Sequence, residues 1–165
     1  HRLGAALGHE TGPAVDRIVT SPLARTLQTA AAVAAATGAA VTVDERFVEL
    51  DYGEWDQRPL ADVAADEWAA WRADVAFAPP GGESLAELGR RVRSGLDDLA
   101  EEARDRTIVV VTHVSPIKAA VAWAVGGTDE MAWRMFVAPA SITRIATSVG
   151  APSLHTFNDC SHLAG

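Results

Sequence analysis

The segment Ile108–Lys118, with the sequence IVVVTHVSPIK, decides the fold class, because a β-branched run stops at a histidine and turns at once toward a helix. Four consecutive aliphatic residues without polar alternation are typical of a strand in a sheet that is covered on both faces. Ser115 and Pro116 suit the N-cap and the first position of the helix that follows. The segment predicts an α/β domain in which His113 lies at the carboxyl end of a buried strand, where open α/β sheets bind ligands. An ordinary strand-end histidine is the alternative.

Length and composition predict one soluble domain. The chain has 165 residues, enough for a sizeable core. No apolar run approaches the roughly 18 residues of a membrane span, and no signal segment opens the chain, so we expect no membrane partner. The single cysteine, Cys160, excludes an internal disulfide framework and favours a cytoplasmic location. The net charge of −8 argues against a surface that binds nucleic acid.

Helix and strand patterns alternate along the chain. We expect strands over residues 15–20, 41–43, 108–111, 141–148 and 153–157. We expect helices over residues 21–38, 61–71, 84–104, 116–125 and 129–135, and the end of an earlier helix over 1–8. Ser84 and Glu87 have the spacing of a capping box at the start of the longest helix. This alternation predicts a three-layer α/β/α sandwich with a mainly parallel, mixed central sheet, in a single domain over residues 1–165.

A second segment with the same pattern as the opening segment suggests an anion site. Residues 18–23, IVTSPL, form a second strand that runs into a threonine and then a Ser-Pro helix start. Both units would bring a helix N-terminus to the same edge of the sheet. Arg25 lies about one turn into the first helix, and His113 belongs to the second unit. An arginine fork and an imidazole beside helix N-termini suit a phosphate or a carboxylate, although a surface ion pair of Arg25 is the alternative.

Four motifs in order then resemble one family, the histidine phosphatase (phosphoglycerate mutase-like) superfamily. They are TSPLARTLQTA at 20–30, ELDYGEW at 49–55, PGGES at 80–84 and VTH at 111–113. The ending at 157–163 and the THVSPIK variant at 112–118 look closest to the acid phosphatase domain that follows a ribonuclease H domain in some actinobacterial proteins, a branch similar to α-ribazole phosphatases.

The resemblance implies a phosphomonoesterase that works through a phosphohistidine intermediate on a small organic phosphate ester, with α-ribazole phosphate as one candidate. By motif matching, Arg25 is the second arginine of a phosphate pocket, His113 is its second histidine, and Glu49 is the proton donor. The backbone N–H of Val114 joins Arg25 and His113 as a phosphate-binding group. The resemblance implies no metal or other cofactor, and it leaves open an N-terminal ribonuclease H fusion and a homodimer.

The chain departs from this family in one important respect. Its 165 residues contain no Arg-His-Gly motif, which carries the nucleophilic histidine in the family. Gly8-His9-Glu10-Thr11 is a poor substitute, because no apolar strand precedes it. We therefore expect the first strand and the nucleophile loop to be missing, and the chain as it stands to lack turnover. A second departure is Val114, where many relatives have glycine, because its β-branched side chain stiffens the turn. A non-catalytic anion-binding or scaffold module fused to a nuclease is the alternative function.

Other residues permit two interpretations each. The aromatic side chains could form a lid that selects the leaving group or could simply belong to the core; these are Trp55, Trp68, Trp71 and Phe77. Four residues near the C-terminus, His155, Asp159, Cys160 and His162, could form a metal site or a polar tail. Lys118 could add charge to the pocket or be solvated, and Glu83 is a first-turn helix acid that relatives suggest lies near the pocket.

A pH dependence is also expected from the resemblance. Glu49 must be protonated to serve as the acid, and His113 must be charged to neutralise the phosphate. Both conditions favour activity at acid pH, since the ordinary pKa of histidine is about 6.5.

Overall fold

Three short parallel strands form the centre of the fold. The computed structural model describes residues 14–56 and 58–164. The strands are β1 (Arg17–Thr20), β2 (Ala40–Val43) and β3 (Ile108–Val111), in the order β2-β1-β3. Thr20 at the end of β1 lies opposite both Val43 and Val111, the last residues of its two neighbours. The three strands therefore end level, and the segments that follow them leave the sheet at the same edge.

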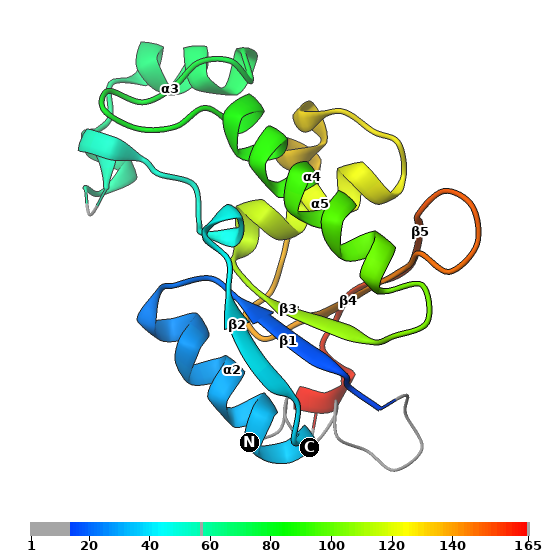
Figure 1. The fold of residues 1–165 in the computed structure, drawn as a ribbon. Coiled ribbons are helices and arrows are strands. Elements are labelled where there is room, and N and C mark those ends of the chain that lie inside the picture. Colours follow the sequence, from blue (N-terminus) through cyan, green and yellow to red (C-terminus); the bar gives the residue numbers. More distant parts are fainter. Residues whose placement is uncertain (1–13, 57, 165) are drawn as a thin grey trace.

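Helices cover both faces of this sheet. Figure 1 shows α2 (Ala24–Thr37) on one side, with α4 (Leu85–Glu102) and α5 (Val114–Ala124) on the other. Neighbouring residues of β1 point to opposite layers, as expected for a strand. Ile18 packs with Ala30 and Val33 of α2, whereas Val19 belongs to the larger core under α4. This arrangement confirms the three-layer α/β/α architecture.

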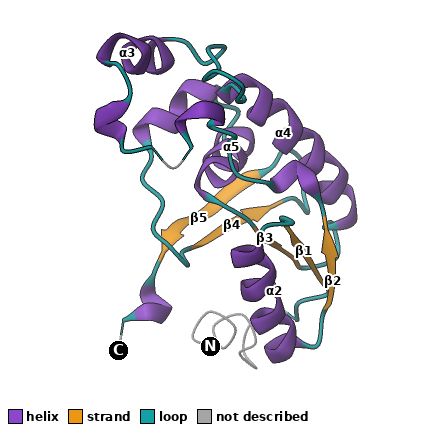
Figure 2. Ribbon diagram, turned by 90° about the vertical axis from the view of Figure 1, so that its left-hand side faces the viewer, coloured by secondary structure: helices purple, strands orange, loops and turns teal. Residues whose placement is uncertain are grey.

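The two C-terminal strands form a sheet of their own. β4 (Ile142–Ala146) and β5 (Ser153–Asp159) pair antiparallel with a register irregularity, and within the described part of the chain they do not hydrogen-bond to the parallel sheet. In Figure 2 they lie beside β3, on the side away from β1 and β2. The expected mixture of parallel and antiparallel strands is present, but it is divided between two sheets.

Helix boundaries differ from the sequence prediction in four places. One is the helix predicted over 61–71, which is divided into the 3-10 helix η3 (Leu60–Asp62) and the α-helix α3 (Ala65–Ala73). The first helix begins at Ala24 and not at Ser21, and the helix after β3 begins at Val114 and not at Pro116. The segment predicted as a helix over 129–135 is a 3-10 helix, η4 (Asp129–Arg134). The remaining short elements are η1 (Glu45–Phe47), η2 (Gly53–Trp55) and η5 (Ser161–Leu163). The expected helix end at 1–8 and the His9 motif lie outside the described residues.

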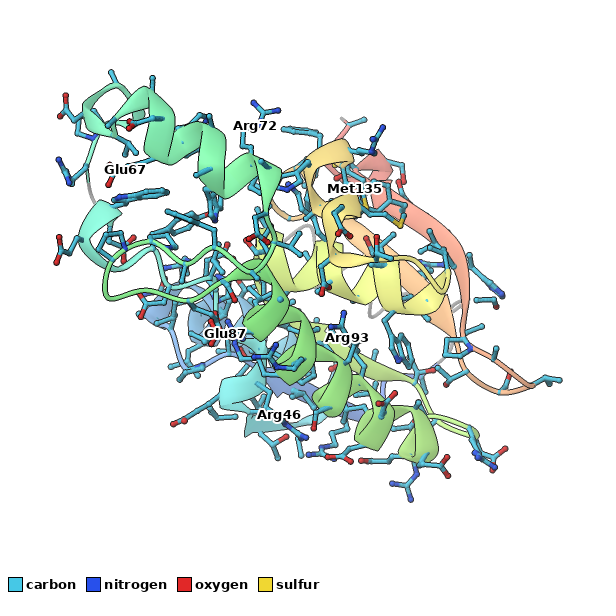
Figure 3. The ribbon with its side chains drawn as sticks, turned by 90° about the horizontal axis from the view of Figure 1, so that it is seen from above. Arg46, Glu67, Arg72, Glu87, Arg93 and Met135 are labelled. Carbon is cyan, nitrogen blue, oxygen red and sulfur yellow. The ribbon has the colours of Figure 1, made fainter. Side chains whose placement is uncertain are left out.

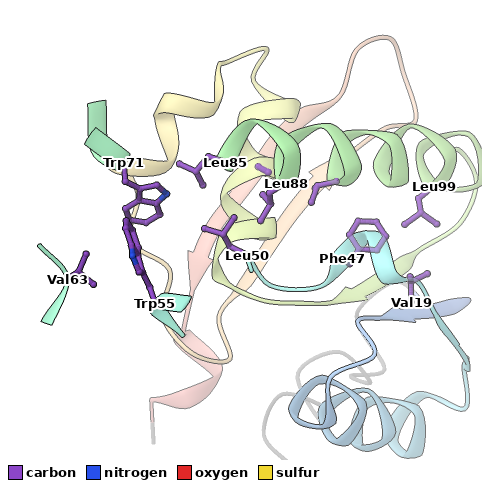
Figure 4. Packing of buried hydrophobic residues seen from close by; sticks show 11 residues of the cluster. Val19, Phe47, Leu50, Trp55, Val63, Trp71, Leu85, Leu88 and Leu99 are labelled. Carbon is purple, nitrogen blue, oxygen red and sulfur yellow. The ribbon is translucent and has the colours of Figure 1, made fainter. Parts of the chain in front are cut away.

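Aromatic side chains build one end of the main core. Trp55 and Trp71 are only 6% and 5% exposed, and their rings meet edge to face at 6.1 Å (Figure 4). Phe77 stacks on Trp55, and the half-buried Trp68 packs against the same cluster. At the other end Phe47 is buried beneath α4, where a Cβ on Gly95 would lie 2.7 Å from its ring. The core interpretation of Trp55 and Trp71 is therefore confirmed.

Two arginines bind α4 to its neighbours (Figure 3). Arg46 pairs with Asp98 of α4 at 2.6 Å, and Arg93 of α4 pairs with Asp129 of η4, also at 2.6 Å. These ion pairs tie the helix to the segment that leads toward Glu49 and to the segment after α5. Within the described residues, no helix has both the length and the apolar character needed to cross a membrane.

Candidate functional site

The ends of β1 and β3 bring Ser21 and His113 together. The backbone N–H of Ser21 donates to the carbonyl of Val111 at 3.1 Å, which continues the pairing of the two strands by one residue. This pairing brings the side chain of Ser21 to the imidazole of His113, two residues after Val111. Nε2 of His113 lies 2.8 Å from Oγ of Ser21. His113 is buried, and it occupies the N-cap position of α5. The sequence prediction placed His113 correctly, at a strand end beside a helix N-terminus.

Arg25 reaches the same imidazole from the first turn of α2. Its Nε–H donates to Nδ1 of His113 at 3.1 Å, so that nitrogen carries a lone pair and the ring proton lies on Nε2, from which it donates to Ser21. Burial lowers the pKa of His113, the charge of Arg25 lowers it further, and Glu49 partly opposes the shift. In the ligand-free site His113 is therefore harder to charge than the ordinary histidine pKa of about 6.5 suggested.

Glu49 caps α5 from a distant part of the sequence. One carboxylate oxygen, Oε1, accepts from the N–H groups of Leu50 at 2.9 Å and Ser115 at 3.1 Å. The other, Oε2, accepts from the N–H of Val114 at 3.2 Å. Pro116 has no N–H to satisfy, so the first turn has all of its donors paired. This explains why the helix begins at Val114 and why Ser115 does not act as its cap.

The contact with Glu49 also bears on the role expected for the N–H of Val114. Its N–H, which the resemblance assigned to phosphate, is engaged by Glu49 in this structure. A phosphate at the helix N-terminus would share or replace that carboxylate. The side chain of Val114 is 41% exposed and lies at the surface of the site.

Arg91 belongs to the surroundings of the site, and sequence reasoning did not single it out. It forms a bidentate ion pair with Glu83, with both N–O distances at 2.7 Å. The same guanidinium donates to the carbonyls of Arg46, Val48 and Glu49 at 2.7, 2.8 and 3.2 Å. Arg91 thus holds the segment that presents Glu49, and Glu83 orients Arg91. Ser21 was missed as well, because its Ser-Pro pattern was interpreted only as a helix start.

The C-terminal polar cluster does not form a metal site here. Within residues 14–56 and 58–164, no group of three or more His, Cys, Asp and Glu side chains is arranged to hold a metal ion. Asp159 instead accepts from the backbone N–H of Ser161 at 2.8 Å.

The protonation of His113 leads to a measurable pH dependence. Because its folded pKa lies below the unfolded value of about 6.5, the stability it contributes is complete above that pH and is lost as the pH falls. A dianion bound beside His113 favours the charged ring, so its binding is coupled to the uptake of a proton by the imidazole. We expect titration calorimetry of the full-length protein with sulfate near pH 6.5, in two buffers of different ionisation enthalpy, to show uptake of up to about one proton per sulfate.

The variant His113→Gln tests whether His113 is the group that takes up this proton. Glu49 and Arg91 also act on the imidazole, and both remain in His113→Gln. The variant should bind sulfate without the uptake. Equal uptake in the variant and the wild type would place the proton on another group.

Comparisons with known proteins agree on one family. A profile of the histidine phosphatase superfamily (branch 1) matches residues 1–160. The chain is 33% identical over 168 residues to Bifunctional protein Rv2228c of Mycobacterium tuberculosis, covering 98% of this chain and 46% of that protein. It is 33% identical over 111 residues to Phosphoserine phosphatase 1 of Hydrogenobacter thermophilus, covering 64% of this chain and 52% of that protein. The chain spans about half the length of these curated relatives.

A solved structure extends the likeness to three dimensions. A mycobacterial glucosyl-3-phosphoglycerate phosphatase in complex with inorganic phosphate superposes with a TM-score of 0.80 at 27% identity. The superposition covers 98% of this chain and 84% of that one.

Proposed function

The chain belongs to the histidine phosphatase superfamily, and from this premise we propose that it forms the phosphate-binding and acid–base part of a phosphomonoesterase. The observation that carries the proposal is the contact of Arg25 with His113 at 3.1 Å, beside a helix N-terminus that already binds the carboxylate of Glu49. Guanidinium, imidazole and a helix N-terminus form an anion site, and a carboxyl group at its edge can supply a proton.

In this proposal each group has one task in phosphoryl transfer. Arg25 and a protonated His113 hold the equatorial oxygens of the phosphate, where charge must be neutralised. Glu49 gives a proton to the oxygen of the leaving alcohol and later takes one from the attacking water. In the ligand-free site the hydroxyl of Ser21 accepts a hydrogen bond from Nε2–H of His113, and in this proposal a phosphate oxygen replaces the hydroxyl as the acceptor.

The attacking histidine is a separate part of the proposal. Since the 165 residues contain no Arg-His-Gly motif, we place the nucleophile on a strand beyond them. Among the described strands, β3 has a hydrogen-bonded neighbour on one side only, and β4 has one only in β5. A strand that enters between β3 and β4 would join the two sheets and deliver its carboxyl end beside His113. The product of its attack would be a phosphohistidine.

The substrate that we propose is a small phosphate ester. Two relatives are named for the hydrolysis of phosphoserine and of glucosyl-3-phosphoglycerate, and the resemblance adds α-ribazole phosphate. A small phosphate ester is common to these compounds. The proposed N-terminal ribonuclease H domain is supported by a relative that is called bifunctional and is about twice as long as the aligned region.

The test is hydrolysis of p-nitrophenyl phosphate by the full-length protein in the presence of a chelator. We expect turnover that needs no added metal and that is faster at acid pH, since His113 must carry a proton to hold the phosphate. Alkyl phosphates need a protonated Glu49 as well. Binding of phosphate without hydrolysis would favour the non-catalytic module instead. That alternative is kept because the nucleophile motif does not occur in the chain.

A further inference from the structure

The segment that presents Glu49 is held largely by side chains from distant elements. Four consecutive carbonyl groups, those of residues 46–49, each accept a hydrogen bond from a side chain. Arg91 of α4 donates to the first, third and fourth of them at 2.7, 2.8 and 3.2 Å, and Thr112 donates to the second at 2.6 Å. Since Thr112 directly precedes His113, these contacts tie the backbone of Glu49 to the strand end that carries the imidazole.

Arg91 has no donor left for a substrate. A guanidinium has five N–H donors. Three of them bind the carbonyl groups of residues 46, 48 and 49, and the other two bind the carboxylate of Glu83 at 2.7 Å each. The side chains of Arg91 and Glu83 are each only 20% exposed. Because groups of this chain occupy all five donors, Arg91 acts on the site through Glu49 and not by contact with a ligand.

The loop that carries Glu83 packs against the motif at 49–55. The N–H of Glu83 donates to the carbonyl of Asp51 at 2.8 Å. The two backbones approach so closely that a Cβ on Gly82 would lie 2.5 Å from the carbonyl oxygen of Asp51. The motif PGGES at 80–84 therefore supplies a turn that fits against the first motif, and its glutamate then binds Arg91.

We propose that Arg91, oriented by Glu83, is a positioning residue for the proton donor Glu49, and that the PGGES motif serves this purpose. The inference rests on the proposed function, because Glu49 is taken to be the acid. Arg91 holds the carbonyl of Glu49, so the carboxyl group moves only through its own side-chain torsions. A general acid must lie within hydrogen-bond distance of the oxygen that it protonates, and a misplacement of about 1 Å can lower a rate about 100-fold.

The first experiment compares glycerol phosphate with p-nitrophenyl phosphate in Arg91→Met of the full-length protein. An alkoxide needs a proton from the acid, whereas p-nitrophenolate leaves without one. We expect kcat for glycerol phosphate to fall about 10- to 100-fold, since the acid is misplaced, while the rate constant of the first p-nitrophenolate burst changes less than about threefold. Steady-state assays and stopped-flow absorbance measure the two quantities.

Two milder variants grade the effect and replace Arg91→Met if that variant does not fold. Arg91→Lys keeps the charge, but its ammonium has three donors on one nitrogen and cannot span Glu83 and three carbonyl groups. It should restore only part of the alkyl phosphatase rate. Glu83→Gln keeps the shape of the partner of Arg91 and removes its charge. We expect it to lower the alkyl phosphatase rate less than Arg91→Met does, with the same dependence on the leaving group.

Arg90→Met is the matched control, because Arg90 is the adjacent residue of α4, is 66% exposed and pairs with Glu87 at 3.9 Å. It should behave as the wild type with both substrates. Equal slowing of the two substrates in Arg91→Met and Glu83→Gln would show a merely structural role. That result, or a wild-type alkyl phosphatase rate in both variants, would overturn the proposal.

Amide hydrogen exchange separates this inference from the proposed function, because it needs no substrate. The N–H groups of Val114 and Ser115 donate to Glu49 and not to Arg91 or its partners. If Arg91 positions Glu49, these two amides should exchange about 10-fold faster in Arg91→Met. The N–H of Val125, which is bonded at the end of the same helix, is the internal reference and should not change. If no ester is hydrolysed, the proposed function fails, and this measurement still decides the inference: unchanged exchange at Val114 and Ser115 would reject it.

Discussion

Glu49→Gln in the full-length protein is expected to lower kcat for an alkyl phosphate such as glycerol phosphate by about 100- to 10,000-fold. An alkoxide leaves only when it receives a proton, and the amide of glutamine has none to give. The same variant should still release p-nitrophenolate in a fast first turnover, because that anion leaves without a proton. Later turnovers should be slow, because Glu49 is also needed to take a proton from water. Stopped-flow absorbance measures this burst, with about one product per active site.

The structural effect of this substitution must be measured separately. Glutamine keeps one oxygen for the N–H groups of Leu50 and Ser115 but loses the oxygen that accepts from Val114. Thermal unfolding of the variant reports the cost of that weaker cap. Glu54→Gln is the matched control, since Glu54 lies in the same motif and is exposed. An alkyl phosphatase rate in Glu49→Gln equal to that of Glu54→Gln would remove Glu49 from the mechanism.

Local patterns in the sequence were enough to predict most of the fold. Gly38 ends α2 with a φ of 75°, as a helix C-terminal glycine should. The capping box is formed, with Ser84 accepting from the N–H of Glu87 at 3.2 Å and Glu87 accepting from the N–H of Ser84 at 2.9 Å. The apolar run before His113 is the central-sheet strand that it was predicted to be. Each of these signals acts within a few residues, and therefore the sequence displays it.

The features that were predicted wrongly or missed depend on distant partners. The start of α5 is set by Glu49, 65 residues before Val114, and a local Ser-Pro rule cannot include that contact. The lowered pKa of His113 depends on its burial and on Arg25, 88 residues away. Arg91 looks like one of several charges along α4 until the fold brings the carbonyl groups of Arg46 and Val48 to it. The motif match predicted that Arg25 and Glu49 belong to the same site as His113. In the structure Arg25 contacts His113, and Glu49 contacts the N–H groups of the next two residues, Val114 and Ser115. The roles of Arg25 and Glu49 remain predictions.

Arg25→Ala is expected to lower kcat/KM about 100- to 1000-fold for alkyl and aryl phosphates alike, because it removes a donor to oxygens that every substrate shares. This equal loss distinguishes Arg25 from Glu49, whose effect should depend on the leaving group. Arg25→Lys should recover only part of the rate, since an ammonium lacks the flat fork that can bind two phosphate oxygens at once. Arg72→Ala, which removes an exposed arginine of α3, is the control and should behave as wild type.

The pH profile of Arg25→Ala provides a second, independent result. The charge of Arg25 is one cause that lowers the pKa of His113, after burial. Without it the imidazole should protonate at higher pH, so the acid-favoured activity that remains should extend toward neutral pH. His113→Ala should lose both the rate and this limb of the profile. When both residues are replaced, the loss should be smaller than the product of the two single losses, because each residue acts on the same phosphate oxygens and on the other's charge. Fully multiplicative losses with an unshifted profile would show that Arg25 and His113 do not act as a pair.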